Sequence, residues 1–64
     1  MVRLSDMSER LEIVIGPQYS ASWRKDVVLP DLGCTVDTAV VNGIDAGIIW
    51  RAVCNFVEVP NSLR

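Results

Sequence analysis

Residues 35–57 have the sequence TVDTAVVNGIDAGIIWRAVCNFV, and this stretch decides the fold class. Thr35 is a suitable N-cap for a short helix, and Asn42-Gly43 provides a turn that ends it. Asp45 can cap a second helix, whose apolar side chains recur at the three- and four-residue spacing of one helical face. The stretch therefore predicts two helices joined by a tight turn, over about 36–41 and 46–57.

The N-terminal part of the chain predicts a further helix over 5–15. Ser5 stands where an N-cap belongs, and apolar residues from Leu4 to Ile15 recur at spacings of three and four. Gly16-Pro17 then ends this helix and is suited to begin another, because glycine is favoured at a helix C-terminus and proline at the first position of a helix.

A second helix is expected over 17–28, because Tyr19, Trp23 and Val27 are four residues apart and share one helical face. Pro30 prevents the helix from continuing. The β-branched pair Val27-Val28 is also compatible with a strand, but no partner strand is evident in the sequence. A lone strand would leave its backbone groups unpaired.

These segments predict an all-α protein: one small helical bundle over residues 1–64, with three to four short helices, a helix-turn-helix-like C-terminal half and a frayed tail over 60–64. We expect Trp50 to be buried with its indole N–H hydrogen bonded, because a thin core needs its large aromatic side chains. The expected core consists of Met7, Leu11, Val14, Tyr19, Trp23, Val27, Val40, Ile49, Val53 and Phe56.

Composition argues against several classes of function. Hydrophobic residues make up 50% of the 64 residues and charged residues 22%, which is typical of a folded globule. The net charge of −2 disfavours nucleic-acid binding, for which neutralisation of phosphates supplies much of the affinity, and also a basic membrane-surface helix. No apolar run approaches the roughly 20 residues that span a bilayer, and no signal peptide is apparent. We therefore expect a cytoplasmic protein without a membrane partner.

No pattern of side chains indicates a catalytic, metal or cofactor site. Cys34 and Cys54 are far apart in a chain without histidine, so they do not form a zinc-binding motif. We expect reduced thiols, one in an exposed loop at Cys34 and one buried as a small hydrophobic group at Cys54. The carboxylates are scattered and the glycines stand singly at turns. The protein is therefore expected to be non-enzymatic, with no cofactor and no metal.

The segment 35–54 raises the question of a DNA-reading helix-turn-helix. Gly43 in the turn and the small Ala39 fit that motif, whereas Thr38 and Asn42 are polar where it prefers apolar residues. The start of the second helix offers few groups that read base edges, and Arg51 is its one basic residue. Two packed helices with a common turn are therefore the favoured interpretation, with the DNA-binding alternative left open.

Three cations form the candidate interaction surface: Arg24, Lys25 and Arg51. The adjacent Arg24 and Lys25 could contact an acidic partner. They are equally compatible with a solvated helix face, in which case their removal should change the free energy of unfolding by no more than about 0.5 kcal/mol.

A combination of short motifs is distinctive in this chain: above all Trp50-Arg51-Ala52-Val53-Cys54 with Val59-Pro60, supported by Ser22-Trp23 and Gly43-Ile44-Asp45. On these motifs the chain resembles, over nearly its whole sequence, a short actinobacterial family of uncharacterised proteins that is defined by a domain of unknown function. This resemblance implies a small cytoplasmic helical protein with no assigned activity.

Two functional hypotheses follow. The first is a non-enzymatic interaction module that binds a protein partner or forms a homo-oligomer, because the chain is rich in apolar residues and lacks site chemistry. The alternative is a DNA-associated adaptor that uses residues 35–54.

Overall fold

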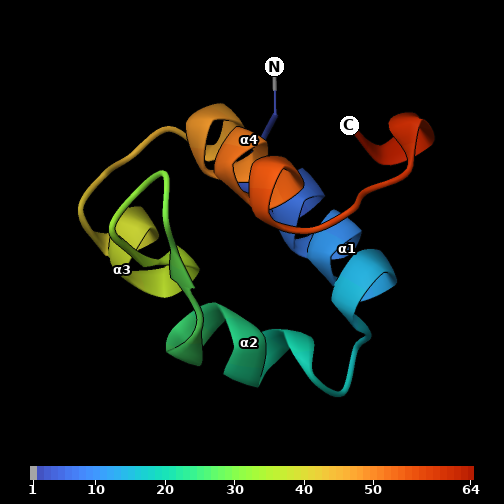
Figure 1. The fold of residues 1–64 in the computed structure, drawn as a ribbon, viewed down its shortest axis with the longest axis horizontal. Coiled ribbons are helices and arrows are strands. Elements are labelled where there is room, and N and C mark those ends of the chain that lie inside the picture. The colour runs from blue at the N-terminus through green and yellow to red at the C-terminus, as the bar shows by residue number, and fades with distance from the viewer. Residues whose placement is uncertain (1) are drawn as a thin grey trace.

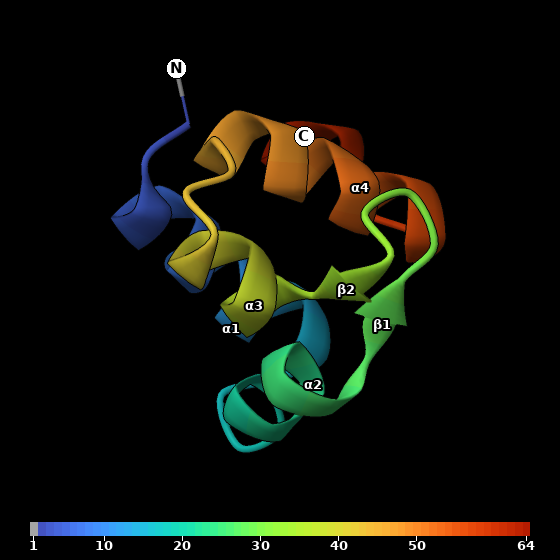
Figure 2. The same cartoon turned by 90° about the vertical axis from the view of Figure 1, so that its left-hand side faces the viewer.

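The structure, a computed structural model, describes residues 2–64 and contains four helices, a short hairpin and a final 3₁₀ turn. The helices are α1 (Leu4–Ile15), α2 (Ser20–Asp26), α3 (Val36–Val41) and α4 (Ala46–Phe56), and the 3₁₀ helix η1 spans Asn61–Leu63. α1 and α4 pack against each other, and α2, the hairpin and α3 close the rest of the core (Figures 1 and 2). None of these helices, within residues 2–64, is long and apolar enough to cross a bilayer.

The protein is mostly helical but not all-α, so that prediction was wrong in part. β1 (Val28–Leu29) pairs antiparallel with β2 (Cys34–Thr35), in the register Val28↔Thr35 and Leu29↔Cys34. The turn between them is closed by Gly33, which has φ +67° and whose N–H donates to the Leu29 carbonyl at 2.8 Å. The partner strand that was not evident in the sequence therefore follows β1 after a turn of four residues, 30–33, which begins with Pro30.

The first two helices begin at residues other than those predicted, and α2 also ends earlier, whereas α1 ends at Ile15 as predicted. α1 begins at Leu4 with Arg3 as its N-cap, so Ser5 does not cap it. α2 begins at Ser20 instead of Pro17, because residues 17–19 form a turn in which the N–H groups of Tyr19 and Ser20 both donate to the Gly16 carbonyl. α2 also ends two residues early, at Asp26, since Val28 pairs in the hairpin.

α3 and α4 begin at the residues predicted from their N-caps, Thr35 and Asp45. The Thr35 hydroxyl accepts a hydrogen bond from the Thr38 N–H at 3.2 Å, and the Asp45 carboxylate accepts one from the Gly47 N–H at 2.9 Å. Between the two helices Gly43 has φ +78°, a left-handed conformation that glycine adopts without strain. α4 ends at Phe56, one residue before the predicted end.

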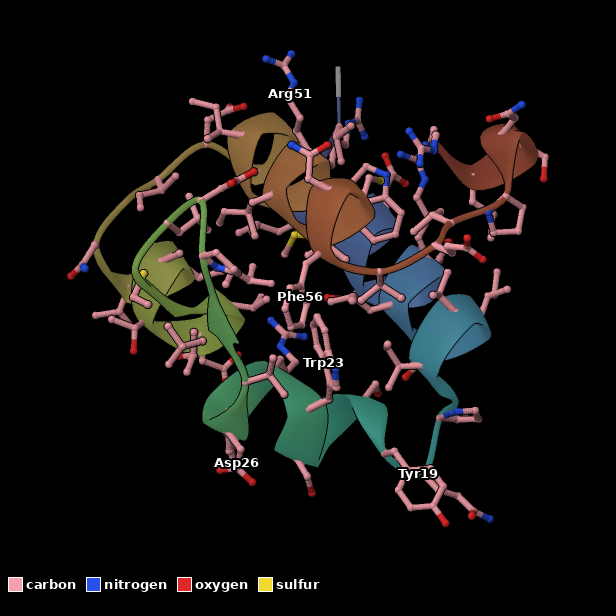
Figure 3. The ribbon with its side chains drawn as sticks, in the orientation of Figure 1. Tyr19, Trp23, Asp26, Arg51 and Phe56 are labelled. Atoms are coloured by element: carbon pink, nitrogen blue, oxygen red, sulfur yellow. The ribbon has the colours of Figure 1, made fainter. Side chains whose placement is uncertain are left out.

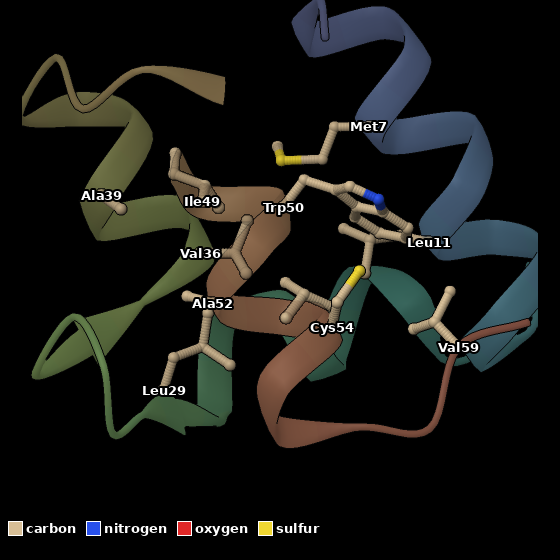
Figure 4. Close-up of a cluster of buried hydrophobic side chains, with 11 residues drawn as sticks. Met7, Leu11, Leu29, Val36, Ala39, Ile49, Trp50, Ala52, Cys54 and Val59 are labelled. Atoms are coloured by element: carbon tan, nitrogen blue, oxygen red, sulfur yellow. The ribbon is translucent and has the colours of Figure 1, made fainter. Parts of the chain in front are cut away.

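The core lies between α1 and α4 and extends to α3 and β1 (Figure 4). Met7, Leu11, Ile49 and Val53 are fully buried, as predicted, and so are three residues absent from the predicted core: Leu29, Val36 and Ala39. Two expected core residues are exposed, Tyr19 by 67% and Phe56 by 48%. The remaining four expected core residues are half-buried: Val14, Trp23, Val27 and Val40.

Tyr19 is exposed because it lies in the turn before α2, not on that helix. Phe56 is the last residue of α4, where fewer neighbouring elements cover it, and its side chain lies near that of Trp23 (Figure 3). Helical spacing identifies a face, but whether a residue at the end of a helix is covered depends on the neighbouring elements.

Candidate functional site

A groove lies along the outer side of α4, between the two ends of the described chain. It has a volume of 590 Å³, within the range of known ligand pockets. Its apolar lining comes from Val2, Ile48, Trp50 and Cys54, and its polar lining from Asp45, Gly47, Arg51, Asn55 and Arg64. The groove thus combines an apolar floor with two guanidinium groups.

Most of the α4 lining follows from helical geometry. Ile48, Arg51 and Asn55 lie three and four residues apart, on the face of α4 opposite the buried Ile49 and Val53. Ile48 is 52% exposed, and Arg51 projects from α4 into solvent (Figure 3). The periodicity that identifies the buried face of α4 therefore also identifies its exposed face, from which only Arg51 was predicted as an interaction residue.

The C-terminal segment forms another wall of the groove. Val59 is buried, and Leu63 is half-buried and packs against the core. The Trp50 indole N–H donates to the Leu63 carbonyl at 3.0 Å, and Arg64 Nε donates to the Val59 carbonyl at 3.2 Å. The prediction of a frayed tail was therefore wrong, because Trp50 supplies a buried donor that the tail satisfies. Trp50 itself is 2% exposed and hydrogen bonded, as predicted.

Arg10 of α1 supports Trp50 from another side. Its guanidinium carbon lies 5.9 Å from the centroid of the Trp50 ring, the distance of a cation–π contact. Arg10 Nη1 is buried and has no hydrogen-bond partner within residues 2–64. The contact with the Trp50 ring is therefore a favourable interaction for the Arg10 guanidinium, whose buried Nη1 lacks a hydrogen bond within residues 2–64.

Cys54 places a thiol at the floor of the groove. Burial raises the pKa of this thiol above its ordinary value of 9.0, while the positive charges of Arg64 and Arg10 act in the opposite direction. Both cysteines are free thiols: Cys54 is buried, as expected, and Cys34 is half-buried in β2 instead of lying exposed in a loop. At neutral pH the Cys54 thiol is therefore a protonated, apolar part of the groove floor.

The structure separates the three cations of the predicted interaction surface. Arg51 lies in the groove on α4, whereas Arg24 and Lys25 are on α2, at the opposite side of the molecule (Figures 2 and 3). Arg24 is not on a solvated face. Its Nε donates to the Asp37 carboxylate at 2.7 Å and its Nη1 to the Ser8 hydroxyl at 3.2 Å, so it joins α2 to α3 and α1. Lys25 is exposed.

The exposed face of α4 bears on the DNA-reading alternative as well. It carries Arg51 and Asn55, side chains that can bond to base edges. However, the Asn55 amide donates to the Asp31 carboxylate at 2.9 Å, and Asp45 lies at the N-terminal end of the same face. Two carboxylates therefore border the surface that would approach the phosphates.

The fold and the groove define a class of protein: a small, mostly helical protein with a mixed apolar and cationic groove along its last long helix. Residues 2–62 match the family described as "Protein of unknown function (DUF3046)", and the chain therefore belongs to that family. No curated protein and no solved structure matches the chain significantly.

Proposed function

We propose that this protein is a non-enzymatic interaction module that binds a segment of another protein in the α4 groove. The groove itself carries the proposal: an apolar floor bordered by Arg51 and Arg64 provides both the buried area and the orienting polar groups that a peptide needs. We also propose that it acts in the cytoplasm, where its two free thiols would remain reduced.

Arginine and tryptophan are the residue types that contribute most often to binding hot spots. Here the base of the groove is held rigid, because Trp50 is fixed by Leu63, Arg10 and the core. A surface that is already ordered loses little conformational entropy when a partner binds, which favours affinity.

Site-specific photocrosslinking in the native host tests this proposal. A benzophenone amino acid at position 48, in the groove, should form a covalent adduct with a second protein. The same amino acid at position 25, on the opposite side of the molecule, is the matched control and should form none. Absence of an adduct at position 48, or equal adducts at both positions, would overturn the proposal.

Self-association is one version of the proposal and has its own test. A monomer mass in sedimentation at high micromolar concentration, together with a heavier adduct from position 48, would assign the groove to a different protein. A dimer mass that is lost when Ile48 is changed to Glu would assign it to a second copy of the chain.

The alternative proposal is a DNA-associated adaptor, supported by the projection of Arg51 and Asn55 from the helix that follows the turn. An amide-shift titration with duplex DNA at low salt separates the two proposals, because even non-specific DNA binders respond strongly there. Shifts along Ile48, Arg51 and Asn55 that vanish as salt is raised would favour the adaptor.

A further inference from the structure

We infer that the α4 groove selects an acidic segment that carries one apolar anchor side chain. This inference depends on the proposed function for the existence of a bound segment, and it adds the chemistry of that segment. Its basis is the contrast between the charge of the groove and the charge of the whole chain.

The groove is cationic in a chain whose net charge is −2. Arg51 is exposed, with no ion pair or side-chain hydrogen bond within residues 2–64, and Arg64 uses only its Nε, on the Val59 carbonyl. The one side-chain carboxylate in the lining, Asp45, accepts the Gly47 N–H as the cap of α4. The Nη groups of the two arginines that line the groove therefore have no hydrogen-bond partner within residues 2–64, and they are donors suited to carboxylates, which can bind guanidinium in a bidentate manner.

A second observation indicates a positive electrostatic potential at the floor of the groove. Arg64 and Arg10 both lower the pKa of the Cys54 thiol against the effect of burial, so their positive charge reaches the groove floor from two elements. Arg10 belongs to α1 and lies over the Trp50 ring, which also lines the groove. An anionic ligand would thus meet positive charge from α1, α4 and the C-terminal segment.

The apolar part of the groove lining favours a bound segment that has an apolar side chain between its acidic residues. Ile48, Trp50, Cys54 and Val2 present hydrocarbon and sulfur surface that a purely ionic ligand would leave wet. Burying a Leu- or Phe-sized side chain there would yield most of the affinity, and the two arginines would fix orientation and discriminate against basic segments.

Three capped peptides test this chemistry on the 64-residue chain by amide-shift titration. The first has one central leucine flanked by glutamates, the second has lysines in place of the glutamates, and the third has serine in place of the leucine. We expect saturable shifts along Ile48, Arg51 and Asn55 with the first peptide only, weakening as salt is raised.

Charge-reversed variants provide the matched controls. Arg51→Glu and Arg64→Glu should each weaken binding of the glutamate peptide about tenfold or more, while Lys25→Glu, on the opposite side of the molecule, should leave it unchanged. The double variant Arg51→Glu/Arg64→Glu should prefer the lysine peptide. Bound glutamate peptide should also slow alkylation of Cys54 and not of Cys34, which lies in the hairpin and does not line the groove.

The two proposals fail in different ways. If adducts form at position 48 but the glutamate peptide binds no better than the lysine peptide, the acidic partner is wrong and the interaction module stands. If the glutamate peptide binds in the groove but no adduct forms in the host, the acidic site stands and the proposed function is wrong. Unchanged binding in Arg51→Glu and Arg64→Glu would also overturn the acidic site.

Discussion

Trp50 shows how one side chain can depend on several distant parts of a short sequence. Its ring lies against the α1–α4 core, its face meets the Arg10 guanidinium, and its N–H donates to Leu63. Burial of Trp50 could be predicted from the scarcity of large apolar residues. Its three partners could not, because they depend on how α1 and the C-terminal segment pack.

Replacing Trp50 should therefore strongly destabilise the fold. Trp50→Ala removes a buried aromatic side chain and should lower the free energy of unfolding by about 3–5 kcal/mol, enough to leave so small a domain largely unfolded. Trp50→Phe keeps most of the apolar volume and should cost less. Urea unfolding followed by far-UV circular dichroism measures both, and a loss below about 1 kcal/mol in Trp50→Ala would contradict the packing described for this residue.

Arg24 and Lys25 are neighbours in sequence that should behave differently. Arg24→Ala removes an ion pair whose side chains are 25% and 37% exposed and should lower stability by about 1 kcal/mol. Lys25→Ala should change it by no more than about 0.5 kcal/mol. A double-mutant cycle with Asp37→Ala isolates the pair, for which we expect a coupling of about 0.5–1 kcal/mol. A coupling near zero would show that the pair contributes nothing.

Cys54 should make stability depend on alkaline pH. Because its pKa is raised in the folded protein, the unfolded chain loses this proton first. The stabilisation is therefore complete below about pH 9, the ordinary pKa, and is lost as the pH rises through the folded pKa. Between pH 8 and pH 10.5, urea unfolding should show a smaller loss of stability in Cys54→Ala than in the wild type. Parallel behaviour of Cys54→Ala and the wild type would contradict the raised pKa.

At the scale of the elements, the first residue of a helix could be predicted where a side chain caps that helix. The first residues of the helices without a side-chain cap could not be predicted as accurately. Thr35 and Asp45 each accept a backbone N–H, and α3 and α4 begin directly after them. α1 and α2 have no side-chain cap, and their first residues were misplaced. The hairpin was missed because its pairing joins only two residues on each side, too few to produce an alternating pattern.

The cap of α4 can be tested directly. Asp45→Ala removes the acceptor of the Gly47 N–H and should lower stability by about 1 kcal/mol. Asp45→Asn retains an acceptor oxygen and should cost less, so it is the matched control. Thermal unfolding measures both variants, and equal losses would show that the charge of Asp45 matters more than its hydrogen bond.

At the scale of the whole molecule, the groove is formed by segments that are remote in sequence. Helical periodicity placed Ile48, Arg51 and Asn55 on one face, so this wall could have been derived from the sequence. Val2 and Arg64 join it only because both ends of the described chain return to α4 (Figure 1). Such long-range packing leaves no local pattern in the sequence, so Arg51 was predicted as an interaction residue and Arg64 was not.

Removing the tail should weaken the whole fold. A chain that ends after Pro60 lacks both the half-buried Leu63 and the acceptor for Trp50. An unsatisfied buried donor costs about 1–3 kcal/mol, so the free energy of unfolding should fall by at least that amount and tryptophan fluorescence should shift to longer wavelength. Ser62→Ala, at an exposed position, is the control. Unchanged stability of the shortened chain would contradict the docking of the tail.

The bond between Trp50 and Leu63 also has a consequence for synthesis on the ribosome. Domains generally fold as units, and this core is complete only when the carbonyl of residue 63 can accept the indole N–H. During translation α1 and α4 would emerge before that acceptor does, with Trp50 lacking its partner. Folding of this core should therefore finish only after residue 63 has emerged from the ribosome, and until then chaperones would have access to its apolar helices.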